Sequence, residues 1–176
     1  MTLLPGRYPF DQVSNGTPGS VCAMLALRLY DAVVALHVMA IVVAFGVVFA
    51  YPVVLPWLRR SHPGSMAVAH EVQVRLGRYV ITPAATLALL AGVYLASDAD
   101  LWGEVWVLVP FVILVAILGV GGAVFAPTER RLAGLAAGGV DSAEYDATFR
   151  RLLGAQTVVA VLVLVAIFLM VTKLGS

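Results

Sequence analysis

The stretch that decides the fold is "VWVLVPFVILVAILGVGGAVFA", residues 105–126, which is 22 residues long and carries no charged side chain. About 20 helical residues are enough to cross the hydrocarbon core of a bilayer. In lipid, every backbone N–H and C=O of an isolated segment must be bonded within that segment, which only a helix achieves. The stretch therefore predicts a membrane-spanning helix at about 104–126.

Three further apolar segments predict spanning helices at about 31–58, 76–97 and 152–174. The first of these could begin as early as Ser20, with an interfacial turn in which Arg28 and Asp31 pair at i,i+3. The chain is 61% hydrophobic and 12% charged, whereas a soluble domain is about 45–50% apolar and about 25% charged. One core could not bury so much apolar surface, so lipid must cover it. We predict an all-α polytopic membrane protein, a four-transmembrane-helix bundle over residues 25–176, preceded by an extracytoplasmic N-terminal segment, 1–24.

The connections between these helices differ in charge. The segment "SDADLWGE", 97–104, has three acids and no base, whereas the connections before and after it are basic. The positive-inside rule places the basic connections in the cytoplasm and both termini outside it. Contact with anionic lipid headgroups is expected for eight arginines: Arg59, Arg60, Arg75, Arg78, Arg130, Arg131, Arg150 and Arg151. The net charge of +1 argues against a nucleic-acid partner.

A faint internal repeat bears on how the helices are organised. "VVFAYP", 47–52, and "AVFAPTERR", 123–131, are similar and lie about 76 positions apart, each followed by arginines. Two repeated helical hairpins of the same orientation would be related by an axis along the membrane normal. Duplication and chance similarity explain the repeat equally well, so both stay open.

Small residues and prolines suggest how the helices pack. Ala84, Ala88, Gly92 and Ala96 follow one another at a spacing of four, which lets two membrane helices approach closely. The second helix could be one of this chain, one of a second copy in a homodimer, or one of a larger membrane complex. Pro83 is expected near a helix start, where its missing N–H costs least. Pro52 is expected to bend the first helix.

The segment "DAVVALHVMAIVVAFG", 31–46, holds one histidine, His37, in an apolar run. An ionisable group within a span is costly and is expected to face the bundle interior. Its imidazole could bind haem iron or another metal, or could only be hydrogen-bonded to a neighbouring helix. Ligand partners at the same depth are Met170, Lys173, Tyr94 or a second copy of His37. Packing for Met170 and a snorkelling anchor for Lys173 are the ordinary alternatives.

Other chemistry has little support in the sequence. His62 and His70 lie eight positions apart in the first basic connection, with Glu71 beside the second, and these are too few ligands for a zinc site. Nucleotide-binding, hydrolase and metalloprotease motifs are absent from the sequence. The predicted spans hold no buried acid, which disfavours an ion transporter. No catalytic residue is assigned, and whether the protein is an enzyme stays open.

Two of these segments carry a family resemblance. "LYDAVVALHVMAIVVAFG", 29–46, and "RLGRYVITPAATLALLAGVYL", 75–95, resemble the first two helices of a group of four-helix bacterial membrane proteins. The group includes an uncharacterised family of predicted integral membrane proteins, the copper-resistance-D-like membrane domains and the J-type protoporphyrinogen oxidases. The resemblance implies a bacterial inner membrane location. In the oxidases it implies a b-type haem bound by the histidine that matches His37.

Three functions are therefore kept. The first is a haem-binding or redox-linked membrane bundle in which His37, with Met170 or Lys173, binds the cofactor or a metal. The second is a non-catalytic bundle or accessory subunit that assembles with itself or with a larger complex. The third is a small transporter.

Overall fold

The computed structural model describes residues 18–174, so most of the predicted segment 1–24 lies outside the described residues. The described residues form helices and turns, with no strand. The elements are α1 (Pro18–Phe45), α2 (Tyr51–Ser61), η2 (Pro63–Ser65), α3 (Met66–Leu76), η3 (Gly77–Ile81), α4 (Thr82–Asp98), α5 (Val105–Val120), η4 (Gly121–Phe125), α6 (Ala126–Ala137) and α7 (Ala143–Thr172).

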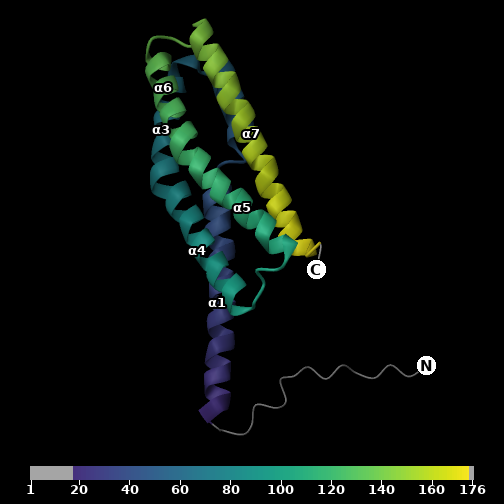
Figure 1. Cartoon of the computed structure of the whole chain (residues 1–176). Coiled ribbons are helices and arrows are strands. Elements are labelled where there is room, and N and C mark those ends of the chain that lie inside the picture. The colour runs from purple at the N-terminus through teal and green to yellow at the C-terminus, as the bar shows by residue number, and fades with distance from the viewer. Residues whose placement is uncertain (1–17, 175–176) are drawn as a thin grey trace, which may run out of the picture.

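Four helical stretches are long and apolar enough to cross a membrane: Arg28–Phe45, Pro63–Asp98, Val105–Ala137 and Ala143–Thr172. They run up and down beside one another, and α1 projects beyond the rest at its N-terminal end (Figure 1). The predicted fold class, an all-α four-helix membrane bundle, is confirmed. The chain is a multi-pass membrane protein.

The first predicted helix, 31–58, is wrong at its C-terminal end, whereas the earlier start near Ser20 that the sequence allowed agrees with the structure. Helix α1 begins at Pro18 and ends at Phe45, a turn follows over 46–50, and α2 starts at Tyr51. The bend that we expected at Pro52 is therefore a break between two helices, α1 and α2. Pro52 lies in the first turn of α2, where its missing N–H leaves no helical bond unmade, so the helix restarts there instead of running through.

The other three helices are longer than predicted, and all of the extra length is at one end of the bundle. Helical structure begins at Pro63 rather than 76, continues to Ala137 rather than 126, and resumes at Ala143 rather than 152. We call this end, formed by α2, α3, α6 and the first turns of α7, the arginine-rich end. Hydropathy finds only the strongly apolar part of each helix, so it missed the more polar helical turns that pack on one another at this end.

Two π-helical turns keep these long helices continuous. Turns η3 and η4 each begin at a glycine, Gly77 and Gly121, and each is followed by a proline six positions after that glycine, Pro83 and Pro127. A π-turn shifts the hydrogen-bond register, which accommodates a proline that would otherwise break the ladder. Pro83 lies in the first turn of α4, as expected, although helical structure there already begins at Pro63.

Each helix packs on the next one along the chain. The most extensive contacts join α1 with α4, the next α3 with α6, and the next α5 with α7 (Figure 1). Because contacts between the two predicted hairpins are as extensive as those within them, the packing does not separate the bundle into two hairpins. The duplication itself stays a prediction, since packing alone does not show ancestry.

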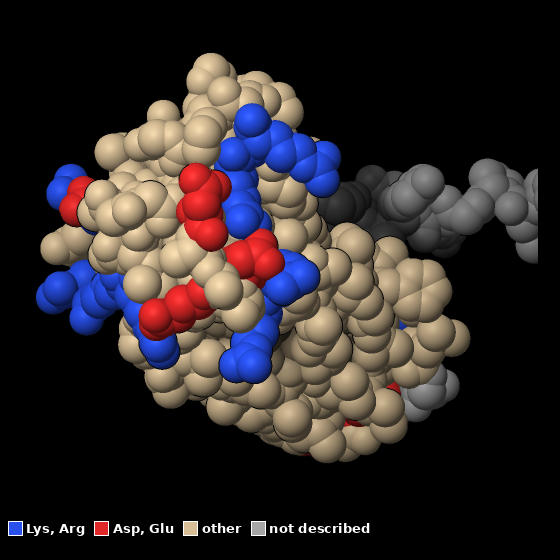
Figure 2. Space-filling model, turned by 90° about the horizontal axis from the view of Figure 1, so that it is seen from above, with Lys and Arg blue, Asp and Glu red and all other residues tan. Residues whose placement is uncertain are grey.

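The arginine-rich end has its own hydrophobic core and its own ion pairs. Its buried core is Tyr51, Leu55, Met66, Leu132, Val140, Tyr145, Phe149 and Leu152. Arginines and acids alternate over its outer surface (Figure 2). Arg59 bonds Asp146 at 2.7 Å, and Arg131 bonds Glu144 at 2.6 Å. These two pairs join α7 to α2 and to α6, whereas Arg75 and Arg150 form ion pairs within their own helices.

Candidate functional site

His37 lies in the half of the bundle away from the arginine-rich end. Its side chain is buried, and Nδ1 is 2.7 Å from the backbone oxygen of Ala88 on α4. Because a carbonyl oxygen only accepts, Nδ1 carries the proton and donates it. Nε2 is therefore the unprotonated nitrogen with a lone pair. A hydrogen bond of this kind is how proteins orient a histidine that binds a metal.

The close approach of α1 and α4 depends on the stripe of small residues. A Cβ built on Gly92 would lie 3.1 Å from Cε1 of His37, nearer than ordinary van der Waals contact. Ala88 and Ala96 are buried on the same helix. Since α1 of the same chain covers this face, the stripe packs two helices within one chain.

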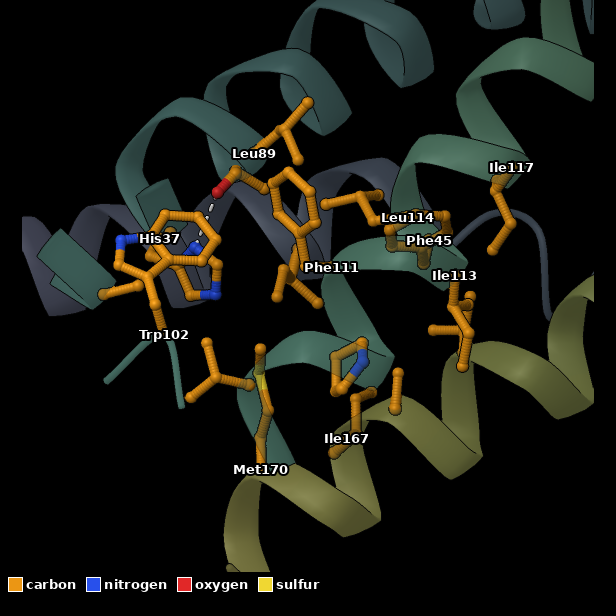
Figure 3. Close-up of a pocket in the computed structure, with 18 residues that line it drawn as sticks. His37, Phe45, Leu89, Trp102, Phe111, Ile113, Leu114, Ile117, Ile167 and Met170 are labelled. Carbon is orange, nitrogen blue, oxygen red and sulfur yellow. Dashed lines mark hydrogen bonds between the residues drawn. The ribbon is translucent and has the colours of Figure 1, made fainter. Parts of the chain in front are cut away.

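His37 borders an apolar cavity of about 70 Å³. Trp102 and Phe111 meet edge to face there, with ring centroids 5.5 Å apart. Figure 3 shows the hydrogen bond from His37 to the Ala88 oxygen as a dashed line, with Trp102, Phe111 and Met170 among the side chains that line the cavity. Apart from His37, the walls are formed by apolar side chains of α1, α4, α5 and α7 and by Trp102. A group that enters this cavity meets one basic nitrogen, that of His37, and otherwise mostly apolar side chains that offer it no hydrogen bond.

The structure separates the predicted ligand partners of His37. Met170 lines the same cavity, whereas Lys173 and Tyr94 do not. The ammonium of Lys173 lies 5.4 Å from the ring centroid of Trp106, a cation–π contact. Sequence reasoning thus found two residues of this cavity, His37 and Met170, and missed Trp102 and Phe111 as its walls.

The cavity fits part of what a haem needs. It offers a lone pair on Nε2 of His37, the thioether of Met170 and apolar walls. Its 70 Å³ is well below the roughly 300–1,000 Å³ of a cavity for a larger ligand, so a haem macrocycle does not fit within the cavity as the helices stand in this structure. Within residues 18–174 no three His, Cys, Asp or Glu side chains gather as a metal site. The two side chains of this cavity that could bind a metal are therefore His37 and Met170.

A second cavity, which the sequence did not reveal, lies toward the arginine-rich end and measures about 240 Å³. We call it the polar cavity, after the buried polar side chains in its wall: Tyr51, Gln73, Glu129 and Gln156. Both π-helical turns contribute to the wall, and Arg78 and Arg130 line it with exposed side chains. Burial, and next the charge of Glu129, raise the pKa of Tyr51 to about 12, so its phenol keeps its proton.

His70 connects the polar cavity to the core of the arginine-rich end. It is completely buried, not part of a polar connection as the sequence suggested. Nδ1 lies 2.9 Å from Oε1 of Gln73, and Nε2 lies 3.1 Å from the hydroxyl of Tyr145. The amide oxygen only accepts, so Nδ1 donates to Gln73 and the Tyr145 hydroxyl donates to Nε2. The spacing of Met66, His70 and Gln73 along one helical face was a usable signal for this burial.

A comparison of the chain with protein-family models, with curated proteins and with solved structures gives no match. The resemblance to the haem- and copper-linked membrane families therefore depends on the quoted helix segments alone. Any function must be argued from the geometry of the two cavities.

Proposed function

We propose that the protein is a membrane bundle that binds a b-type haem through Nε2 of His37. The observation that supports this proposal is the 2.7 Å hydrogen bond from Nδ1 of His37 to Ala88, which fixes the tautomer with the lone pair on Nε2. When bound, the haem would supply one-electron exchange within the membrane.

The chain's own residues would prepare the site in three ways. The Ala88 carbonyl holds the imidazole plane, and Gly92 leaves room for it. The apolar walls keep water away from the iron, and the apolar shell around a metal site tunes its redox potential. Met170 of α7 borders the same space and is the second ligand that we propose. Lys173, over Trp106, is outside this ligand set.

The test is a visible spectrum of the full chain, expressed with haem supplied and purified in mild detergent. We expect a Soret band in the wild type and its loss in His37→Ala, because the axial nitrogen is removed. His62→Ala is the matched control, since His62 is exposed, and should keep the band. A colourless wild-type preparation would contradict the proposal and favour the non-catalytic bundle or accessory subunit.

We also propose that the protein lies in a bacterial inner membrane with the arginine-rich end in the cytoplasm and both termini outside. The arginines of α2, α3, α6 and α7 support this orientation. A periplasm-dependent reporter fused after Ser176 should be active, and the same reporter inserted at Gly139 should be silent. The reverse pattern would overturn the orientation.

A further inference from the structure

The polar cavity holds three buried polar atoms that lack a partner among the described residues: the Tyr51 hydroxyl, Nε2 of Gln73 and Oε1 of Gln156. The three side chains are 9%, 3% and 3% exposed. A buried polar atom that is left unbonded is destabilising, and native proteins keep few of them. Because all three residues line the same space, the cavity is suited to a molecule that both donates and accepts hydrogen bonds.

The charge of that molecule follows from Glu129. Its side chain is buried, and among the described residues it accepts a hydrogen bond from Nε2 of Gln156 at 3.3 Å. No lysine or arginine among residues 18–174 lies within ion-pair distance of it. A buried carboxylate is costly without a cation. Oε1 of Gln156, also unpartnered, adds a second acceptor beside it, and together these suit a group with several N–H donors.

The rim of the cavity has the opposite character. Arg78 of η3 and Arg130 of α6 both line it and are exposed, and neither forms an ion pair within the described part of the chain. Guanidinium groups bind phosphate well through paired hydrogen bonds. The remaining wall is apolar and includes Phe45, Ile117 and Val159. One space thus offers an acidic interior, a basic rim and an apolar wall.

We propose that the polar cavity binds phosphatidylethanolamine, with its primary ammonium group at Glu129 and Gln156 and its phosphate at Arg78 and Arg130. The acyl chains would follow the apolar wall toward the membrane. The cavity volume of about 240 Å³ is larger than the roughly 30 Å³ that one water molecule takes up in the liquid. This assignment is independent of His37 and of haem, and it differs from general attraction of arginines to anionic lipids because the ammonium group is recognised.

The experiment measures lipid retention by the delipidated full chain, using native mass spectrometry from mild detergent. The probes are phosphatidylethanolamine, phosphatidylcholine and phosphatidylglycerol with identical acyl chains. Phosphatidylcholine keeps the positive charge and the phosphate but has no N–H to donate. We expect the wild type to retain phosphatidylethanolamine at least ten-fold better than either of the other lipids.

Glu129→Gln removes the buried carboxylate and should reduce that preference to within two-fold. Glu71→Gln is the matched control, because Glu71 is an exposed carboxylate on α3, and it should leave the preference unchanged. The double variant Arg78→Gln with Arg130→Gln should weaken retention of the ethanolamine and choline lipids about equally. Because Arg78 and Arg130 are exposed, this double variant leaves the buried core unchanged and tests the site even if Glu129→Gln fails to fold.

Equal retention of the ethanolamine and choline lipids by the wild type would overturn the proposal, as would preference for phosphatidylglycerol. Soluble phosphoethanolamine at the same concentration should displace little of the bound lipid. Complete displacement would overturn the lipid as the occupant and assign the site to a soluble amine phosphate.

Discussion

Replacing Tyr145 with alanine is expected to lower the free energy of unfolding of the arginine-rich end by about 3–5 kcal/mol, as for other large aromatic core residues. Tyr145 is 0% exposed. Its ring stacks on Phe149 with centroids 5.8 Å apart, and the guanidinium of Arg59 lies 5.3 Å from its centroid. The hydroxyl also satisfies Nε2 of His70. One substitution therefore removes packing, a cation–π contact and a buried hydrogen bond together.

The measurement is thermal or denaturant unfolding in mild detergent, followed by circular dichroism. Tyr145→Phe separates the contributions: it keeps the ring and should cost only about 1–3 kcal/mol, because Nε2 of His70 is left without its donor. Tyr79→Ala is the control, since Tyr79 is 69% exposed, and a surface change should stay within about 0.5 kcal/mol. Equal losses for Tyr145→Ala and Tyr79→Ala would contradict the packing described for this end.

The second large effect is expected for Gly92→Leu. A Cβ at this position would lie 3.1 Å from Cε1 of His37, and the imidazole cannot turn away without losing its 2.7 Å bond to Ala88. The larger side chain should force α1 and α4 apart. Overpacking of this kind costs about 1–3 kcal/mol. If haem binds at His37, the substitution should also reduce haem retention.

Unfolding measurements and size-exclusion chromatography together test this prediction. Gly119→Leu is the matched control, because no heavy atom lies within 4 Å of a Cβ built there, and it should unfold like the wild type. Gly92→Leu should be less stable with an unchanged oligomeric state, since the stripe contacts α1 of its own chain. A change in oligomeric state at unchanged stability would show instead that the stripe joins two copies.

The four spans could be predicted from the sequence because the requirement is local. A bilayer demands about 20 apolar residues whose backbone bonds close within the segment, and such runs are visible without knowing what they pack against. The interior position of His37 followed for the same reason, since lipid is a poor environment for an imidazole. Helix ends were predicted less well. The break at 46–50 and the extra helical turns before 76, after 126 and before 152 depend on how the helices pack on one another, which hydropathy does not show.

The sequence by itself determined the class of protein and the number of spans. It also determined part of the cavity at His37, because His37 stood out as a polar residue in an apolar run and Met170 as a partner at the same depth. Only the tertiary structure decided the tautomer of His37, the walls formed by Trp102 and Phe111, and the whole polar cavity. Tyr51, Gln73, Glu129 and Gln156 come from α2, α3, α6 and α7. Each is ordinary in its own segment, and they become unusual only when helix packing buries them around one space away from water.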